Sequence, residues 1–114
     1  MAKPTHEDAQ LMVQLAQWGT SLGFQDVVPQ LLDEGFDPET ADIQTHEPVR
    51  IVLMFGESIG TLVKHDLLSR ELVEDWIWLA GLWSRVGPAA LKQREKFGEP
   101  RLYENFEALA TGSR

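Results

Sequence analysis

The chain has 114 residues, of which 43% are hydrophobic, and it carries a net charge of −8. This length and composition are typical of a single globular domain that buries a core of its own. Because the chain has no cysteine, it can form no disulfide, no thiolate zinc site and no cysteine nucleophile.

The negative charge lies in the first half of the chain. Residues 1–57 contain ten acids and two bases, a balance of −8, and the remaining residues contain eight of each. Binding to nucleic-acid phosphates needs clustered Lys and Arg, so we expect no nucleic-acid partner. Apolar runs such as residues 51–55 are far shorter than the ~20 residues that span a bilayer. The N-terminus has no apolar signal core either, so we expect a cytoplasmic protein with no membrane partner.

Helical spacing of apolar residues predicts two helices in the first third of the chain. Thr5 followed by Asp8 resembles a capping box, and Gly23 is placed to end the first helix. A shorter helix is expected over about 26–34. Residues 37–39, Asp-Pro-Glu, form a further start signal that opens one or two turns.

The central helix is expected over about 46–64 and is apolar almost all round, which is typical of a helix buried by neighbours on several sides. Arg50, Glu57 and Lys64 are spaced by sevens, so we expect them to form its solvent edge. Gly56 and Gly60 form a small-x-x-x-small pair that permits close helix packing. This spacing favours packing within the chain over a dimer seam.

A Trp-rich helix is predicted over 69–85, with Trp76 and Trp83 on its core face. We expect Gly87-Pro88 to end this helix. Another helix then follows and ends near Phe97, and a last helix is expected over about 101–110. The fold class is therefore all-α: one domain over 1–114, a compact bundle of about five to six helices around the central one. Residues 1–4 and 111–114 are expected to fray.

Trp78 points away from the core face of this predicted helix, onto a stripe of charged residues. Leu82 lies four residues later and hence on the same face, and Asp75 and Arg85 flank the pair. Trp and Arg are enriched at interface hot spots. These four residues are the predicted interface, covered by a second chain or by another helix of the monomer.

Other site chemistries find less support in the residues. Each of the three histidines is followed by an acid, and adjacent helical residues point about 100° apart, so we expect no metal site. Glu57 lies in the most apolar helix, where burial can raise the pKa of a carboxylate, but no second catalytic group accompanies it. The stretch 46–85 has the outline of a helix-turn-helix, yet acids open its second helix and argue against DNA.

The stretch from Phe55 to Ala110 resembles a bacterial family of small helical proteins of unknown function. The resemblance rests on Phe-Gly-Glu-x-x-Gly-x-Leu-Val-Lys at 55–64, Leu-Leu at 67–68, Leu-Val at 72–73 with the Trp-rich helix, and Gly-Glu-Pro-Arg-Leu-Tyr-Glu-Asn-Phe-Glu at 98–107. It implies a helical fold and supplies no catalytic or binding residue.

We therefore expect a non-enzymatic protein-interaction module that forms a homodimer through the Trp78/Leu82 face, and no cofactor. The alternative is a protein that binds a small molecule or effector in a Trp-lined pocket. The residues expected in such a pocket are Glu57, Trp76 and Trp83.

Overall fold

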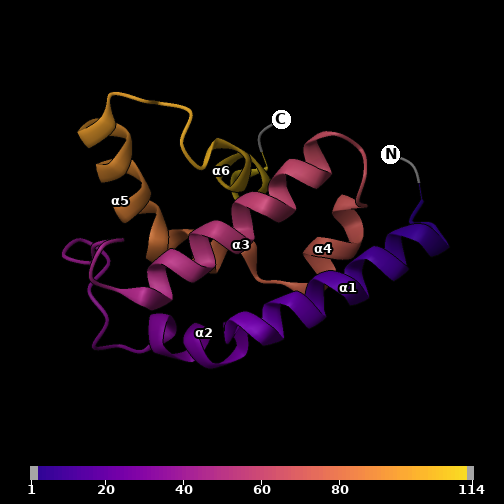
Figure 1. The fold of residues 1–114 in the computed structure, drawn as a ribbon, viewed down its shortest axis with the longest axis horizontal. Helices are drawn as coiled ribbons and strands as arrows, with labels where there is room; N and C mark the ends of the chain where they lie inside the picture. The colour runs from indigo at the N-terminus through magenta and orange to yellow at the C-terminus, as the bar shows by residue number, and fades with distance from the viewer. Residues whose placement is uncertain (1–2, 113–114) are drawn as a thin grey trace.

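The computed structural model describes residues 3–112, and this part of the chain contains six α-helices and no strand (Figure 1). The all-α prediction is therefore confirmed. The helices are α1 (His6–Leu22), α2 (Phe24–Leu32), α3 (Glu47–Lys64), α4 (Arg70–Trp76), α5 (Leu79–Phe97) and α6 (Glu104–Thr111). Residues 1–2 and 113–114, part of the predicted frayed ends, lie outside the described residues, and Thr111 is the last residue of α6.

Local capping sets the first helix as its sequence predicts. The Thr5 hydroxyl accepts the backbone N–H of Asp8, and the Asp8 carboxylate accepts the N–H of Thr5 at 2.8 Å, which completes a capping box. Gly23 ends α1 in the left-handed conformation, with φ +80. The next helix follows at once, so α1 and α2 form a bent arm along one side of the molecule (Figure 1).

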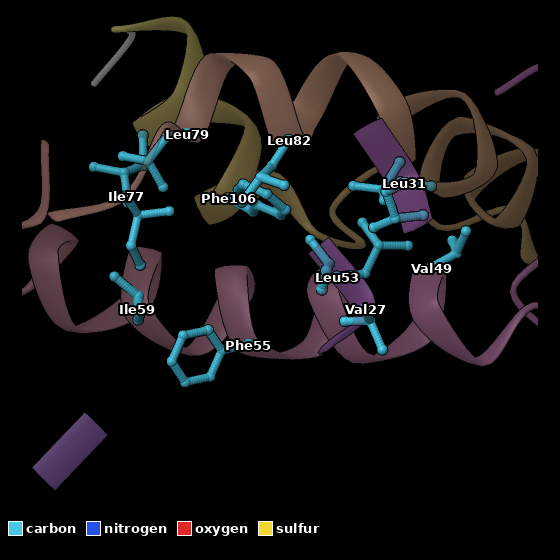
Figure 2. Close-up of a cluster of buried hydrophobic side chains, with 14 of the residues drawn as sticks. Val27, Leu31, Val49, Leu53, Phe55, Ile59, Ile77, Leu79, Leu82 and Phe106 are labelled. Atoms are coloured by element: carbon cyan, nitrogen blue, oxygen red, sulfur yellow. The ribbon is translucent and has the colours of Figure 1, made fainter. Parts of the chain in front are cut away.

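The central position of α3 is also confirmed. It crosses the middle of the molecule, with α1 and α2 on one side and α5 and α6 on the other (Figure 1). Eight of its residues are buried, as expected for a helix that packs on more than one side. Figure 2 shows the core that results, in which apolar side chains of α2, α3 and α5 meet Phe106 of α6.

The segment between α2 and α3 is irregular. Asp37 begins a single hydrogen-bonded turn, because its carbonyl accepts the N–H of Thr40 and of Ala41. Ala41 and Ile43 then bury their side chains in the core. This connection closes the end of the bundle near the start of α3.

The prediction of one continuous Trp-rich helix over 69–85 is wrong. Ser69 does cap α4, but α4 ends at Trp76 and α5 begins at Leu79. Ile77 is extended, with φ −126 and ψ 134. Both Ile77 and Leu79 are buried, and residues two apart share a face only in an extended chain. Burial of both side chains therefore favours a break in the helix.

The predicted break at Gly87-Pro88 is also wrong, since both residues lie inside α5. A proline disfavours the helical conformation of the preceding residue through a clash with its Cβ. Gly87 has no Cβ, so this clash is absent. Gly87 is moreover buried beside Trp83, whose ring would lie 2.9 Å from a Cβ built at 87. Because Trp83 and Gly87 are four residues apart in α5, this contact forms within the helix that continues through Pro88.

Candidate functional site

The α4–α5 junction sets the direction of Trp78. The N–H of Leu79 donates to the carbonyl of Ile77 at 2.9 Å, and Trp78 between them has φ −78 and ψ 79, close to the values of an inverse γ-turn. Its two neighbours point into the core. Trp78 consequently points outward, and 68% of its surface is exposed.

The indole of Trp78 lies against the first turn of α5. A Cβ built at Gly81 would overlap the indole ring, so only glycine permits this close approach. The ring therefore rests with one face on α5 and leaves the other face open to solvent.

An apolar groove lies beside Trp78, between α1, α2 and the α4–α5 junction. Its volume is about 210 Å³. None of its lining residues is charged, and Thr20 and Gln25 bring polar side chains to it. The lining residues are Ala16, Gly19, Thr20, Phe24, Gln25, Val28, Leu32, Phe55, Trp76, Ile77, Trp78 and Leu82.

An aromatic cluster forms the floor of this groove. The ring of Phe55 lies 4.7 Å from that of Phe24, 5.3 Å from Trp18 and 6.2 Å from Trp76, measured between centroids. The contact with Trp76 is edge-on, a favourable arrangement for aromatic pairs. Phe24, Phe55 and Trp76 of this cluster line the groove, so the cluster joins elements distant in the sequence beside it.

The predicted interface needs a correction at Leu82. This residue is only 4% exposed and lies in the core next to Phe106 (Figure 2). The break before Leu79 shifts the phase of the helix, so Leu82 turns inward while Trp78 stays outside. Asp75 is exposed. Arg85 is half-buried and donates to the carbonyl of Phe36 at 3.4 Å, so it is held within the monomer.

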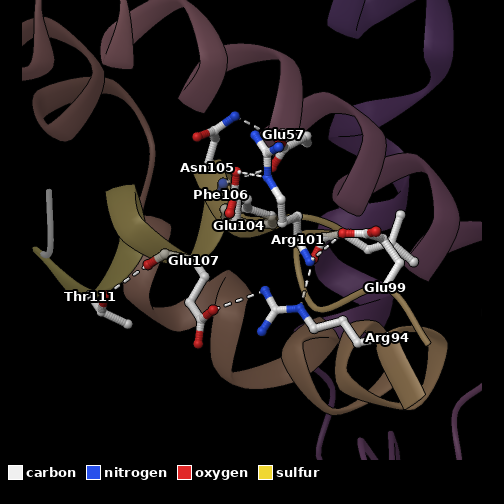
Figure 3. Close-up of polar contacts among 10 residues, drawn as sticks. Glu57, Arg94, Glu99, Arg101, Glu104, Asn105, Phe106, Glu107 and Thr111 are labelled. Carbon is white, nitrogen blue, oxygen red and sulfur yellow. Dashed lines mark hydrogen bonds and ion pairs between the residues drawn. The ribbon is translucent and has the colours of Figure 1, made fainter. Parts of the chain in front are cut away.

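Glu57 does not lie on a solvent edge with Arg50 and Lys64. Its carboxylate accepts the backbone N–H of Phe106 at 2.9 Å and the side-chain amide of Asn105 at 2.9 Å (Figure 3). These donors belong to the first turn of α6, whose N-terminus favours a negative charge. Glu57 therefore holds α6 on α3.

The residues predicted for a Trp-lined pocket do not come together. Trp76 lines the groove, whereas Trp83 packs edge-on against Phe106 with 5.2 Å between ring centroids. Glu57 contacts the start of α6. The structure thus separates the three residues into the groove and the α6 docking site.

Two side chains have shifted pKa values. Burial raises the pKa of the Tyr103 hydroxyl above its ordinary value of 10.0, and the negative charge of Glu57 raises it further. The pKa of Asp8 is lowered, mainly because its carboxylate accepts the backbone N–H of Thr5. Asp8 also accepts the N–H of Ser69 at 3.0 Å, so it ties the start of α1 to the start of α4.

Neither a metal centre nor a membrane span is found in residues 3–112. No group of three or more His, Asp or Glu in this part of the chain could hold a metal ion. No helix formed by these residues is long and apolar enough to cross a bilayer.

Sequence reasoning missed the half of the groove that comes from α1 and α2. Phe24, Val28 and Thr20 line it, and none was singled out because their helices show ordinary amphipathic patterns. Gly23 was a usable signal for this half of the groove, because a glycine between two helices allows a tight turn. The turn brings Phe24 close to Gly19, and a Cβ built at Gly19 would lie 3.6 Å from Phe24.

Comparison with protein families matches residues 5–113 to a family described as a domain of unknown function, DUF4760. The chain belongs to this family. The match covers the first half of the chain as well as the stretch from Phe55 onward. The searches of curated proteins and of solved structures found no significant match.

Two of the stretches that carry the resemblance to a helical family, 55–64 and 98–107, contact each other in this DUF4760 domain. Gly56 lies under the ring of Phe106, which would be 2.5 Å from a Cβ at that position. Gly60 lies against the backbone of Asn105, whose carbonyl oxygen would overlap a Cβ built at 60. Together with Glu57 they form the docking site of α6, so these motifs have a structural role.

Proposed function

We propose that this DUF4760 protein is a non-enzymatic protein-interaction module that forms a homodimer through Trp78 and the groove beside it. The observation that carries the proposal is an indole that is 68% exposed next to an uncharged apolar groove. Tryptophan is among the residue types most enriched at interface hot spots, where it is typically desolvated in a pocket of the partner.

The local cost of Trp78 supports a role outside the monomer. It occupies the N-cap position of α5 and makes no side-chain cap hydrogen bond. Ser, Thr, Asp and Asn are preferred there because they satisfy an N–H of the first turn. Trp78 thus gives α5 no cap hydrogen bond and stays outside the core, and its packing is limited to the contact with Gly81.

The size of the groove favours a protein side chain over a small molecule. Ligand pockets usually measure about 300–1,000 Å³, and this groove measures about 210 Å³. It has room for one large side chain. At this Trp-lined groove the comparison favours a protein side chain over an effector, and it does not extend to the larger hollow between α3, α4 and α6, which measures about 470 Å³.

Sedimentation analysis of wild type and Trp78→Ser tests the proposal. We expect wild type to dimerise as its concentration rises, and Trp78→Ser to dimerise at least about tenfold more weakly, as for a hot-spot residue. Serine suits the N-cap position, so the variant should keep a wild-type unfolding temperature to within a few degrees in thermal melts.

Phe97→Ser is the matched control, because Phe97 is 61% exposed at the other end of α5. Its removal should leave dimerisation unchanged. A wild type that stays monomeric at high concentration contradicts the proposal, and so does a Trp78→Ser variant that dimerises like wild type.

A further inference from the structure

The larger hollow lies between the last two turns of α3, the start of α4 and one side of α6, and its volume is about 470 Å³. This volume falls within the range of about 300–1,000 Å³ that is usual for small-molecule pockets. The apolar side chains of Val63, Ala108 and Leu109 line the hollow together with two basic ones, those of Lys64 and Arg70. It shares no lining residue with the Trp-lined groove.

Arg70 is a fixed cation at this hollow. Its side chain is only 11% exposed. Nε donates to the carboxylate of Glu74 at 3.1 Å, and Nη2 donates to the backbone carbonyl of Leu109 at 3.0 Å. Nη1 has no hydrogen-bond partner within residues 3–112 and is not completely buried. The guanidinium is therefore held on two sides by the protein and keeps one nitrogen free for an acceptor.

Lys64 supplies the positive charge that no side chain compensates. It is the exposed last residue of α3, and within residues 3–112 its ammonium group forms neither an ion pair nor a hydrogen bond. The other charges at the hollow are paired, since Glu74 neutralises Arg70 and Arg101 lies 3.1 Å from Glu104. The hollow thus carries one unpaired positive charge, although the whole chain is strongly acidic.

We propose that this hollow binds a small organic molecule that has one carboxylate and a short apolar body. The carboxylate accepts a hydrogen bond from Nη1 of Arg70 and lies in the field of Lys64, because guanidinium and ammonium groups are the usual partners of a carboxylate. The apolar body lies on Val63, Ala108 and Leu109. The site is separate from the Trp-lined groove, so this inference goes beyond the proposed function and does not depend on it.

The other end of the hollow disfavours a second anionic group. Glu104 brings a carboxylate to it, and Asn105 uses its side-chain N–H groups in hydrogen bonds to α3, so only the side-chain oxygen of Asn105 remains free. Asn105 lies against Gly60, which precedes Lys64 by one helical turn, or about 6 Å along the axis. A second carboxylate would therefore lie close to acceptors and a negative charge. A phosphate group, with a charge of about −1.5 to −2, would also exceed the single unpaired positive charge.

Hexanoate is a suitable probe, because it has one carboxylate and a short apolar chain. In a titration followed by NMR of the isotope-labelled protein at low salt, it should shift the amide signals of residues 60–64 and 104–109 and the side-chain N–H signals of Arg70. We expect a dissociation constant on the order of 1 mM, as for a ligand of so few atoms. Hexylamine and adipate should bind at least about tenfold more weakly, since the first lacks the carboxylate and the second carries two.

Two variants locate the probe. Lys64→Gln should weaken hexanoate binding about threefold, as for an exposed charge pair, and Ala108→Leu should abolish it by filling the hollow. Lys96→Gln is the control, because it removes the same charge at an exposed position of α5 outside the hollow, and it should bind like wild type. Arg70 is followed by its NMR signals and not by substitution, since it also holds the carbonyl of Leu109.

Thermal melts show whether each variant folds. The inference is overturned if hexanoate shifts no signals at the hollow, if hexylamine or adipate binds as tightly, or if Lys64→Gln binds hexanoate like wild type. Shifts confined to residues 16–32 and 76–82 would place the probe in the Trp-lined groove and would overturn it as well. Sedimentation tests the proposed dimer independently, so a monomeric wild type leaves this inference standing.

Discussion

Glu57 of α3 supplies the hydrogen-bond acceptor that the first turn of α6 lacks. The N-cap residue of α6 is Tyr103, in the left-handed conformation with φ +59 and without a side-chain cap hydrogen bond. The carboxylate of Glu57 accepts the N–H of Phe106 instead. A negative charge at this place also interacts favourably with the helix dipole. One residue of α3 therefore fixes both the position and the start of α6.

The hydroxyl of Tyr103 should make stability depend on pH in the alkaline range. Its pKa is raised in the folded protein by burial and by the charge of Glu57, whereas an unfolded tyrosine titrates near 10. The folded state therefore keeps the proton to a higher pH than the unfolded state. This contribution is fully present below about pH 10 and is lost as the pH rises through the folded pKa. Tyr103→Phe should show a smaller loss of stability there in denaturant titrations.

The same pKa can be measured directly, because Tyr103 is the only tyrosine and its ionisation gives a separate absorption band. Glu57→Gln removes the neighbouring charge and should lower this pKa toward its ordinary value. Glu47→Gln, at an exposed position of the same helix, should leave it unchanged. An unchanged tyrosinate titration in Glu57→Gln would rule out the electrostatic contribution.

The sequence pattern correctly predicted that Trp78 is exposed, but it wrongly placed Leu82 on the same exposed face. Their spacing of four puts them on one face only if the helix is continuous. The break at Ile77 turns Leu82 into the core. The force that breaks the helix is the burial of Ile77 and Leu79 in the core, and no local signal such as proline or glycine marks it. Trp78 does point outward as predicted. Its direction results from the turn at the α4–α5 junction, however, and not from its position around one continuous helix.

At the level of whole helices, the contact between α3 and α6 depends on two glycines. Gly60→Ala tests this dependence, because the two effects of the substitution oppose each other. Alanine raises helix propensity by up to about 1 kcal/mol. Its Cβ, however, would overlap the carbonyl oxygen of Asn105, and backbone cannot yield without moving α6. Overpacking of this kind costs about 1–3 kcal/mol, so we expect a lower unfolding temperature.

Met54→Ala is the reference for this experiment. Met54 is 41% exposed on the same helix, so its substitution should change the free energy of unfolding by less than about 0.5 kcal/mol. Should Gly60→Ala be as stable as wild type or more stable, the close approach of α6 would not be a constraint on this position.

Helices bounded by local signals were predictable, and those bounded by tertiary contacts were not. The capping box at Thr5 and the left-handed Gly23 set α1 where the sequence places it. Pro88 gives an equally clear local signal, yet α5 continues through it, because Gly87 removes the usual clash and packs under Trp83. The groove was unpredictable for a related reason: its walls come from helices far apart in sequence.

At the scale of the whole molecule, the acidic half of the chain forms one wall of the groove. No Lys or Arg lies between Lys3 and Arg50, and this stretch contains α1 and α2. Asp26 and Asp75 are exposed near the ends of the lining segments. In a two-fold dimer an uncharged contact is therefore surrounded by negative charges on both copies. Their repulsion determines whether salt strengthens or weakens the dimer.

Salt should strengthen the dimer. The Debye length falls from about 10 Å at ~0.1 M to about 3 Å at ~1 M ionic strength, which screens the repulsion between two chains of charge −8 and leaves the apolar contact of Trp78 in place. Sedimentation equilibrium across a sodium chloride series should give a dissociation constant that decreases with salt. The opposite trend would indicate that unlike charges hold the copies together, as in a contact between the acidic α1–α2 wall and the exposed Lys92 and Lys96 of α5. Such a contact would be head-to-tail and would contradict a symmetric dimer formed through Trp78.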